Sequence, residues 1–252
     1  MSPLDRRRLL LGGAGALLAG CSASPHRAAV APVTDTPSTS APATASRDTV
    51  AADLPFEIRS GPRTRPQLAL TFHGQGDPRL ADALLAEAER ADARITVLAV
   101  GTWLQEYPAL AKRILDGGHE LGNHTQHHVA VSSLSPDRQY AEIRACADQL
   151  RKLTGGIGRW FRPSQAQDCT PSVAAEARRA GYTHCLSYDL DSLDWTDPGA
   201  EAVTRTVLGG ARAGSVVSLH LGHAGTVAAL PAVLDGLRQR GLRAVTTTEL
   251  LS

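Results

Sequence analysis

The chain has 252 residues, with 26 lysines and arginines against 25 aspartates and glutamates, and a formal net charge of +1. A balance this close to neutral, without a dense basic stripe, argues against nucleic acid as a partner. Only 4% of the residues are aromatic, so an aromatic side chain next to a candidate site is an informative feature.

The first 21 residues resemble a bacterial export signal. Three arginines at 6–8 precede an apolar run at 9–18, which is shorter than the roughly 20 apolar residues of a membrane-spanning helix. The run ends in Leu-Ala-Gly-Cys, which resembles a lipobox whose cysteine, Cys21, receives a lipid. We therefore expect a lipoprotein signal peptide at 1–21, and the alternative is an ordinary secretory signal with an incidental cysteine. The arginines followed by leucines also resemble a twin-arginine signal.

Residues 22–52 are rich in alanine, proline, serine and threonine and contain few large apolar side chains. Such a segment cannot bury enough apolar surface to offset the entropy lost on ordering, so we predict a disordered linker. Its ends would lie on the order of 30 Å apart. It would tether a single domain at 53–252 to the outer face of the bacterial membrane, with the lipid as the only membrane contact.

Between residues 53 and 252, short apolar runs alternate with longer amphipathic segments. The predicted strands lie at 67–72, 95–100, 160–162, 184–189, 215–219 and 243–246. The predicted helices lie at 80–91, 107–115, 136–154, 171–180, 200–211 and 231–240, with a last helical turn at 249–251. This alternation implies right-handed crossovers between parallel strands. It predicts an α/β fold, and we favour a closed or nearly closed barrel over a three-layer open sheet.

The domain contains three cysteines, Cys146, Cys169 and Cys185. An odd number allows at most one disulfide, and a bond between Cys169 and Cys185 is conceivable in an exported protein. The interpretation that we favour is that all three are small buried apolar residues.

Polar clusters follow the ends of four predicted strands, at 71–77, 123–128, 189–195 and 219–223, and they hold six of the nine histidines. The carboxyl ends of parallel strands meet at one edge, so we expect these clusters to lie together. His124 and His128 are four residues apart, and on one helical turn both imidazoles would face the same side, a spacing that a divalent metal accepts. With His73 and His220 after other strands, this pattern predicts a metal site.

Residues 118–128, GHELGNHTQHH, resemble the second motif of the NodB-type polysaccharide deacetylases, carbohydrate esterase family 4, whose pattern is G-H-E-x-G-N-H-[ST]-x-x-H. Residues 161–163 resemble the third motif of that family, 187–195 the fourth and 217–220 the fifth. The resemblance extends over 67–252. It implies an α/β fold of the NodB type, a distorted (β/α) barrel of about seven parallel strands.

The resemblance also implies a function. Members of this family hydrolyse acetyl groups from polysaccharides such as peptidoglycan or other N-acetylated glycans, with a metal-bound water as the nucleophile. His124 and His128 would hold a divalent metal, and we favour zinc, although cobalt or another ion is also compatible. His220 would be the general acid that protonates the leaving amine, and Asp191 the carboxylate that orients it.

The remaining roles also come from the resemblance. Arg162 would tune the base. Trp195, Leu219 and Asp194 would contact the substrate, and the first two of these would form the wall of the acetyl pocket.

The first motif departs from the family pattern T-F-D-D-G, in which the first aspartate is the base and the second a metal ligand. Here residues 71–74 read Thr-Phe-His-Gly. His73 could move onto the metal as the third ligand, or it could act as the base while Asp77 or water completes the metal site. Alternatively, the domain binds glycans without turnover. Because the polar residues of the other motifs are present, we favour an active hydrolase.

Overall fold

A computed structural model describes residues 54–252 of the chain. The predicted signal peptide at 1–21, including Cys21, and the predicted linker at 22–52 lie outside the described residues. Within 54–252, no helix is long and apolar enough to cross a membrane.

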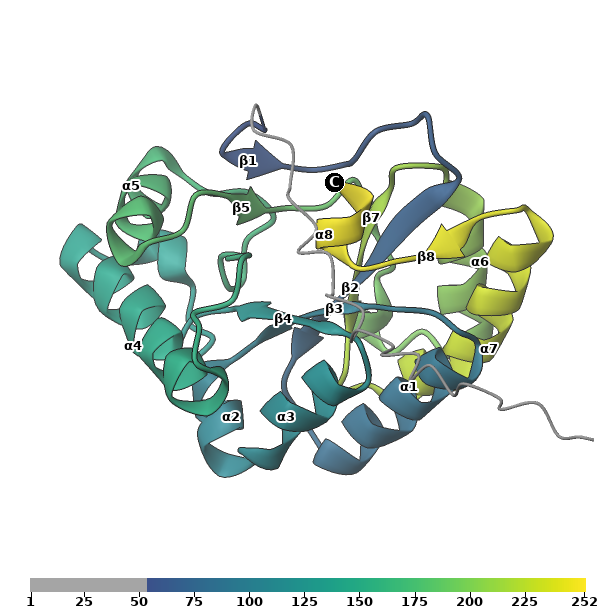
Figure 1. Ribbon diagram of the computed structural model, residues 1–252, viewed down its shortest axis with the longest axis horizontal. Helices are drawn as coiled ribbons and strands as arrows, with labels where there is room; N and C mark the ends of the chain where they lie inside the picture. The colour runs from purple at the N-terminus through teal and green to yellow at the C-terminus, as the bar shows by residue number, and fades with distance from the viewer. Residues whose placement is uncertain (1–53) are drawn as a thin grey trace, which may run out of the picture. The chain divides into compact units, whose positions relative to one another are not determined.

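Parallel strands lie at the centre of the domain, and helices lie around them (Figure 1). The strands are β1 (Glu57–Ile58), β2 (Gln67–Gly74), β3 (Thr96–Ala99), β4 (Glu120–Asn123), β5 (Cys185–Leu186), β6 (Leu190–Asp191), β7 (Val216–His220) and β8 (Arg243–Ala244). The helices are α1 (Pro78–Arg90), α2 (Gly101–Glu106), α3 (Ala109–Asp116), α4 (Pro136–Thr154), α5 (Pro171–Ala180), α6 (Ala200–Gly210), α7 (Ala224–Gln239) and α8 (Thr247–Leu250).

The strands form a ring. They run in the order β4-β3-β2-β7-β6, β8 pairs with β2, and every one of these pairings is parallel. Phe161 extends the ring beyond β4, because it bridges Asn123 on one side and Cys185 of β5 on the other. The chain then runs directly from β5 to β6, which pairs with β7. The α/β fold with parallel strands that the sequence predicts is confirmed, and this arrangement of strands is compatible with the predicted distorted barrel.

Alternation along the strands separates two environments. In β2, Leu68, Leu70 and Phe72 belong to the core between the strands and the surrounding helices. Thr71 and His73 alternate with them and hydrogen-bond instead to Arg162 in the interior of the ring. The larger apolar core therefore lies outside the ring. On the inner face of β2, Ala69 belongs to a second apolar cluster with Leu186 and Val216, whereas Thr71 and His73 belong to the polar site.

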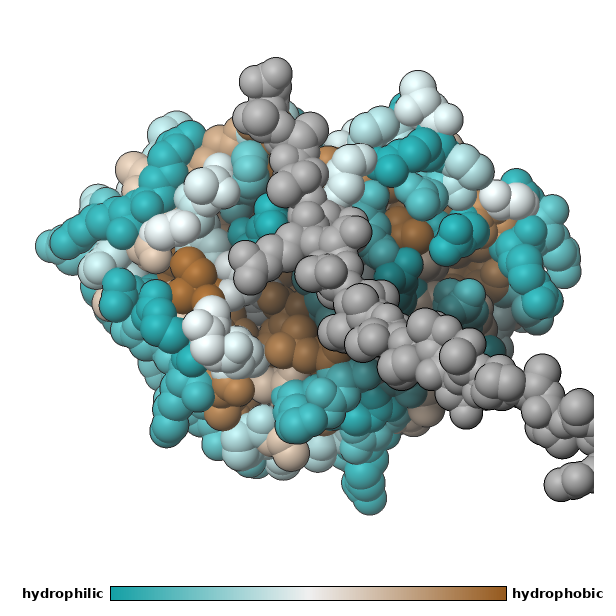
Figure 2. All heavy atoms as spheres, in the orientation of Figure 1, coloured by the Kyte–Doolittle hydropathy of each residue, from teal (hydrophilic) through white to brown (hydrophobic). Residues whose placement is uncertain are grey.

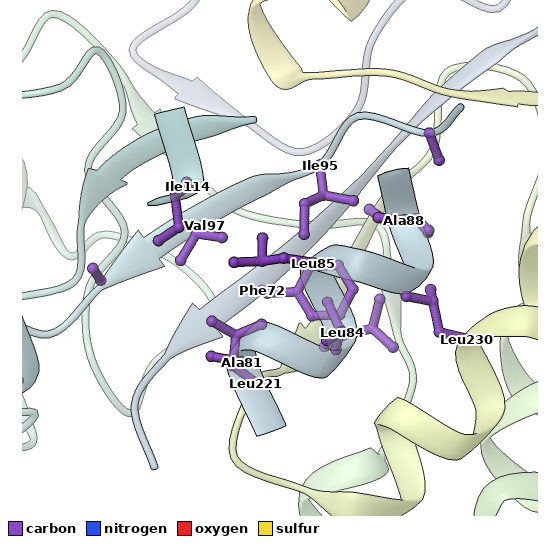
Figure 3. Close-up of a cluster of buried hydrophobic side chains, with 14 of the residues drawn as sticks. Phe72, Ala81, Leu84, Leu85, Ala88, Ile95, Val97, Ile114, Leu221 and Leu230 are labelled. Atoms are coloured by element: carbon purple, nitrogen blue, oxygen red, sulfur yellow. The ribbon is translucent and has the colours of Figure 1, made fainter. Parts of the chain in front are cut away.

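Helix α1 shows how the outer core forms. Its buried residues, Ala81, Leu84, Leu85 and Ala88, recur at helical spacing and form one apolar stripe. Figure 3 shows this stripe packed beside Phe72 and the strands. The space-filling view is mainly hydrophilic around its rim, as expected for helices whose outer faces meet water (Figure 2).

Helix α7 begins at Ala224, so the predicted helix at 231–240 was wrong at its start. The prediction placed Pro231 in the first turn, where its missing N–H costs nothing. The structure places Pro231 inside the helix, on an exposed face. Buried residues continue at helical spacing on both sides of it, so burial of that face offsets the lost hydrogen bond.

Other elements also differ from the predictions, and the predicted strand at 184–189 is reduced to β5. Residues 101–106 form helix α2, which was not predicted, and α3 starts only after Pro108. The predicted strand at 160–162 is reduced to the bridge at Phe161. The predicted strand at 243–246 ends at Ala244, because Thr246 caps α8 through a capping box with Glu249.

Glu120, at the start of β4, connects the ring to the C-terminal helix. Its Oε1 accepts hydrogen bonds from Trp160 Nε1 at 2.8 Å and from the Thr248 hydroxyl, and its Oε2 accepts from Thr248 N at 3.1 Å and Thr96 Oγ1 at 3.2 Å. Burial raises the pKa of the Glu120 carboxyl, and these hydrogen bonds oppose the shift. Each carboxylate oxygen therefore accepts from an N–H group, Trp160 Nε1–H or Thr248 N–H, that can only donate a hydrogen bond.

This arrangement predicts the effect of Glu120→Gln. One end of the amide would present its NH₂ to Trp160 Nε1–H or to Thr248 N–H, and neither group can accept a hydrogen bond. We expect the free energy of unfolding at pH 7 to fall by about 1–3 kcal/mol, measured by chemical denaturation. Glu201→Gln is the matched control, since the Glu201 side chain is 90% exposed. Equal stability of the two variants would contradict the assigned role of Glu120.

Candidate metal centre and active site

The four polar clusters meet at the carboxyl ends of the strands, as predicted. His73 lies near the end of β2, His124 follows β4, and His220 ends β7. A cavity of about 450 Å³ opens there, and His73, His128, Tyr188, Trp195 and His220 are among its lining residues. The β2–β7 register places His73 directly beside His220.

Imidazole rings form a continuous row through this site. The ring centroid of His73 is 4.4 Å from that of His124 and 4.3 Å from that of His220. The His124 and His128 centroids are 5.0 Å apart. His73 therefore contacts both the predicted metal ligand His124 and the predicted general acid His220.

His124 is held in a state that suits metal binding. Its Nδ1 lies 3.0 Å from the carbonyl oxygen of Arg162, and because a carbonyl only accepts, Nδ1 carries the proton. Its Nε2 is buried and has no hydrogen-bond partner. Burial lowers the pKa of His124 well below its usual value, so the ring is neutral at pH 7. A neutral imidazole fixed through Nδ1–H with a bare Nε2 is the form in which histidine binds metals.

His128 lies beside His124, as predicted, but the backbone conformation that places it there is not the predicted helical turn. Residues 124–128 form a loop and not a helical turn, with left-handed backbone at Thr125 (φ 68°) and His128 (φ 55°). This conformation is strained for a β-branched threonine. Hydrogen bonds from Thr125 N to Asn123 Oδ1 at 2.8 Å and from Thr125 Oγ1 to Ser164 Oγ at 2.9 Å hold it in place. The loop, and not helical periodicity, brings the two histidines together.

One nitrogen from each of His73, His124 and His128 lies within 4.8 Å of the others. Within the described part of the chain, this is the one group of histidine, cysteine or acidic residues with such spacing. Nitrogen donors of this kind suit zinc and similar divalent ions. The three residues therefore form a cluster that could hold a divalent metal.

Arg162 lies fully buried beneath this cluster. Its Nη1 is 3.2 Å from His73 Nε2, its Nη2 donates to Thr71 Oγ1 at 2.9 Å, and its Nε donates to the carbonyl of Leu186 at 2.7 Å. Burial lowers the pKa of the guanidinium to about 10, which leaves it charged at neutral pH. Arg162 thus contacts His73 directly, and its predicted role in tuning the base stays a prediction.

Asp194 orients His220, so the prediction that Asp191 does so was wrong. Asp194 Oδ1 lies 2.7 Å from His220 Nδ1, and Asp194 Oδ2 accepts from His220 N at 2.8 Å and from Thr226 Oγ1 at 2.6 Å. Burial tends to raise the pKa of Asp194, but the hydrogen bonds from His220 and Thr226 outweigh it and hold the pKa below its usual value. At 1% exposure, Asp194 also cannot contact substrate, which corrects its predicted role.

Asp191 lines the cavity but does not contact His220, and its side chain makes a local structural contact. Its Oδ1 accepts a hydrogen bond from Leu193 N at 2.9 Å, and Leu193 has φ 58°. This turn ends β6 and moves the chain so that Asp194, in a 3-10 turn at Asp194–Thr196, lies beside His220. Strand alternation could not reveal this, because the strand stops at Asp191.

Two further predicted roles are not compatible with the structure. Leu219 belongs to the core outside the ring, on the face of β7 opposite to Ser218 and His220, so it forms no wall of the cavity. Asp77 caps α1 and accepts hydrogen bonds from Arg79 N at 2.9 Å and from the Arg79 guanidinium, and it lies outside the histidine cluster. In contrast, Trp195 lines the cavity and is 53% exposed.

Several site residues were not identified from the sequence. Ser218, Gln75, Gln165 and Tyr188 line the cavity, and Thr226 on α7 holds Asp194. Alternation in β7 could have indicated Ser218, since it faces the same side as His220. Nothing in the local sequence signals Thr226, because its contact spans 32 positions of the chain.

Cys169 and Cys185 form a disulfide, and Cys146 is buried and free. Our preference for three unpaired apolar cysteines was therefore wrong for two of them. The bond connects β5 to the loop before α5, which carries the cavity residues Gln165 and Gln167. Only the fold brings these two residues together, 16 positions apart.

The bare nitrogen of His124 predicts a metal requirement that can be measured without a substrate. We expect the purified protein to bind a divalent metal, and His124→Ala to weaken that binding by roughly 100-fold or more, measured by competition with a chromogenic chelator. His127→Ala is the matched control, because His127 is exposed and pairs with Glu142. Equal affinities of the two variants would contradict a metal site at His124.

Comparison with known proteins identifies the family. Residues 60–185 match the polysaccharide deacetylase family. A peptidoglycan-N-acetylglucosamine deacetylase of Bacillus cereus is 32% identical over 200 residues, which cover 75% of this chain and 90% of that protein.

Solved structures share the fold. A peptidoglycan N-acetylglucosamine deacetylase crystallised with an N-oxidanyl-benzamide superimposes with a TM-score of 0.73 and 26% identity, covering 78% of this chain and 92% of the other. A carbohydrate esterase family 4 pseudoenzyme from Bacillus anthracis has a TM-score of 0.74 and 24% identity, covering 79% of this chain and 70% of the other, and shows the fold alone. By sequence match and coverage, the chain belongs to the polysaccharide deacetylase family.

Proposed function

We propose that this protein is a metal-dependent hydrolase that removes acetyl groups from an N-acetylated cell-wall polysaccharide such as peptidoglycan. The observation that carries the proposal is the position of the His220–Asp194 pair in the same histidine cluster as the bare nitrogen of His124, with the His73 ring in contact with both imidazoles. The name of the Bacillus cereus relative supports peptidoglycan as the substrate.

His124 and His128 are the residues that would hold the metal, and zinc is the ion that we propose. The buried Nε2 of His124, which has no partner, fits such an ion, since a buried nitrogen without a partner is otherwise costly. When bound, the metal would polarise the acetyl carbonyl and lower the pKa of a water molecule.

His220 is the proposed general acid. Its Nδ1–H donates to Asp194, which leaves Nε2 as the nitrogen that can hold a proton for the leaving amine. Asp194 stabilises the protonated imidazole, and Thr226 keeps Asp194 in place. His220 lines the cavity, so its free nitrogen is within reach of a bound sugar.

The cavity suits a sugar residue. Trp195 presents an exposed aromatic ring at its edge, and the amide side chains of Gln75, Gln165 and Gln167 line it. A volume of about 450 Å³ lies within the usual range of small-molecule sites. We propose that Trp195 packs against the sugar while the amides bind its hydroxyl and acetamido groups.

A second candidate function is glycan binding without turnover. The observation that favours it is the absence of a carboxylate at positions 73 and 74. A Cβ at Gly74 would lie 2.9 Å from Val97 Cγ1 and 3.0 Å from Ala99 Cα, so a side chain there would meet β3. Position 74 as folded here therefore leaves no space for a ligand to the metal.

Acetate release decides between these functions. The zinc-loaded protein should release acetate from N-acetylated peptidoglycan fragments, and Asp194→Asn should reduce kcat by about 100-fold or more. The amide would present its NH₂ either to His220 Nδ1–H or to His220 N–H, and without a negative charge it cannot stabilise the protonated imidazole. Asp137→Asn, at a residue on α4 whose side chain is 97% exposed, should change kcat little. Zinc binding and glycan binding without acetate release would establish the binding function instead.

We further propose that a lipid on Cys21 holds the protein at the outer face of the bacterial membrane, with residues 22–52 as a linker. The apolar run that ends at Cys21 supports this proposal. Cys21→Ala should move the protein from the membrane fraction to the medium, measured by fractionation and immunoblotting. Continued membrane association of that variant would refute the lipid anchor.

A further inference from the structure

The orientation of the Arg162 guanidinium is fixed by acceptors on several sides. Its Nε donates to Leu186 O at 2.7 Å, and its Nη2 donates to Ser187 O at 3.0 Å and to Thr71 Oγ1 at 2.9 Å. The Thr71 hydroxyl gives its own proton to Val217 O at 2.7 Å, so its oxygen must accept from Arg162. The side chain has 0% exposure, and no water competes for these bonds. The guanidinium therefore cannot turn away from its neighbours.

The remaining nitrogen of the guanidinium determines the state of His73. Arg162 Nη1 lies 3.2 Å from His73 Nε2. Because a guanidinium has N–H donors and no acceptor, Nε2 must accept with its lone pair. A neutral imidazole has one protonated nitrogen, and here that nitrogen is Nδ1. Ser218 Oγ, 3.1 Å from the same Nε2, can donate its hydroxyl proton as well.

The backbone of Arg162 determines the protonation of His124, but it does so as a hydrogen-bond acceptor, whereas the guanidinium acts on His73 as a donor. Its carbonyl accepts the Nδ1 proton of His124, and Nε2 of His124 has no partner. Both rings therefore carry their proton on Nδ1, but only His124 has a free lone pair. The lone pair on His73 Nε2 already accepts a hydrogen bond from the Arg162 guanidinium.

We infer that Arg162 holds His73 as a neutral hydrogen-bond donor with its proton on Nδ1, so that His124 and His128, and not His73, are the histidine ligands of the metal. The inference rests on the proposed function for the presence of the metal. To bind the metal through Nε2, His73 would have to give up the hydrogen bond from Arg162. To bind it through Nδ1, His73 would have to lose the proton on that nitrogen. His73 is then a positioning residue, which offers one N–H group between the metal ligands and His220.

The tautomer can be observed directly. In the metal-free, full-length protein labelled with ¹⁵N, the His73 side chain should show a protonated Nδ1 and an unprotonated Nε2, with the signals assigned by their loss in His73→Gln. A protonated Nε2 in His73 would overturn the inference. Because this measurement needs neither metal nor substrate, it is independent of the proposed function.

Zinc affinity tests the second half of the inference. In His73→Gln, the amide oxygen can accept from Arg162 and the amide NH₂ can donate, so the variant reproduces the inferred state of His73. We expect its zinc affinity to equal that of the wild type within error, while His124→Gln loses about 100-fold. A comparable loss in both variants would show that His73 is a ligand and overturn the inference. If the wild type bound no zinc, the proposed function would fail, and the tautomer would still decide the state of His73.

Discussion

The buried side chain of Arg162 is the interaction on which the site depends. It donates to the backbone carbonyls of Leu186 at the end of β5 and of Ser187 after it, and also to Thr71 and His73 on β2. It therefore connects two parts of the ring across its interior. Burying a charge is expensive unless hydrogen bonds replace its hydration. Here carbonyl, hydroxyl and imidazole acceptors replace it, and the ring of Tyr188 lies 5.3 Å from the guanidinium carbon. No carboxylate pairs with Arg162 among residues 54–252.

This chain lacks both carboxylates of the family's first motif, at positions 73 and 74. In the family pattern an aspartate precedes the position of Gly74, and a cation beneath it would favour its ionised form. With His73 in that position, the same cation favours a neutral ring, because its Nε2 must accept from Arg162. The change at position 73 thus replaces an anionic group at the candidate metal site with a neutral one, and the glycine at position 74 removes the second carboxylate of the pattern. The acid side of the site, with His220, Asp194 and Thr226, keeps a complete hydrogen-bond network.

The fold separates these tasks by strand alternation. Phe72 and Leu219 pair across β2 and β7 and face the helices, whereas His73 and His220, one residue further, face the cavity. The helices can therefore pack against a continuous apolar layer, while the cavity lined by His73 and His220 stays polar. A left-handed turn at Leu193 and another at Thr125 then place Asp194 and His128, which strand geometry alone would not bring to the site.

The sequence by itself determined the alternation of strands and helices, the polar clusters after the strands and the family. These features follow from local periodicity and from motifs contained within a few residues, as in GHELGNHTQHH. The tertiary structure alone decided that Asp194 and not Asp191 supports His220, that Leu219 is core, and that Cys169 bonds to Cys185. Each of these depends on where a chain bends after an element ends, or on a partner far away in the sequence. The state of His73 likewise depends on Arg162, 89 positions later, because a histidine takes its protonation pattern from its neighbours in space.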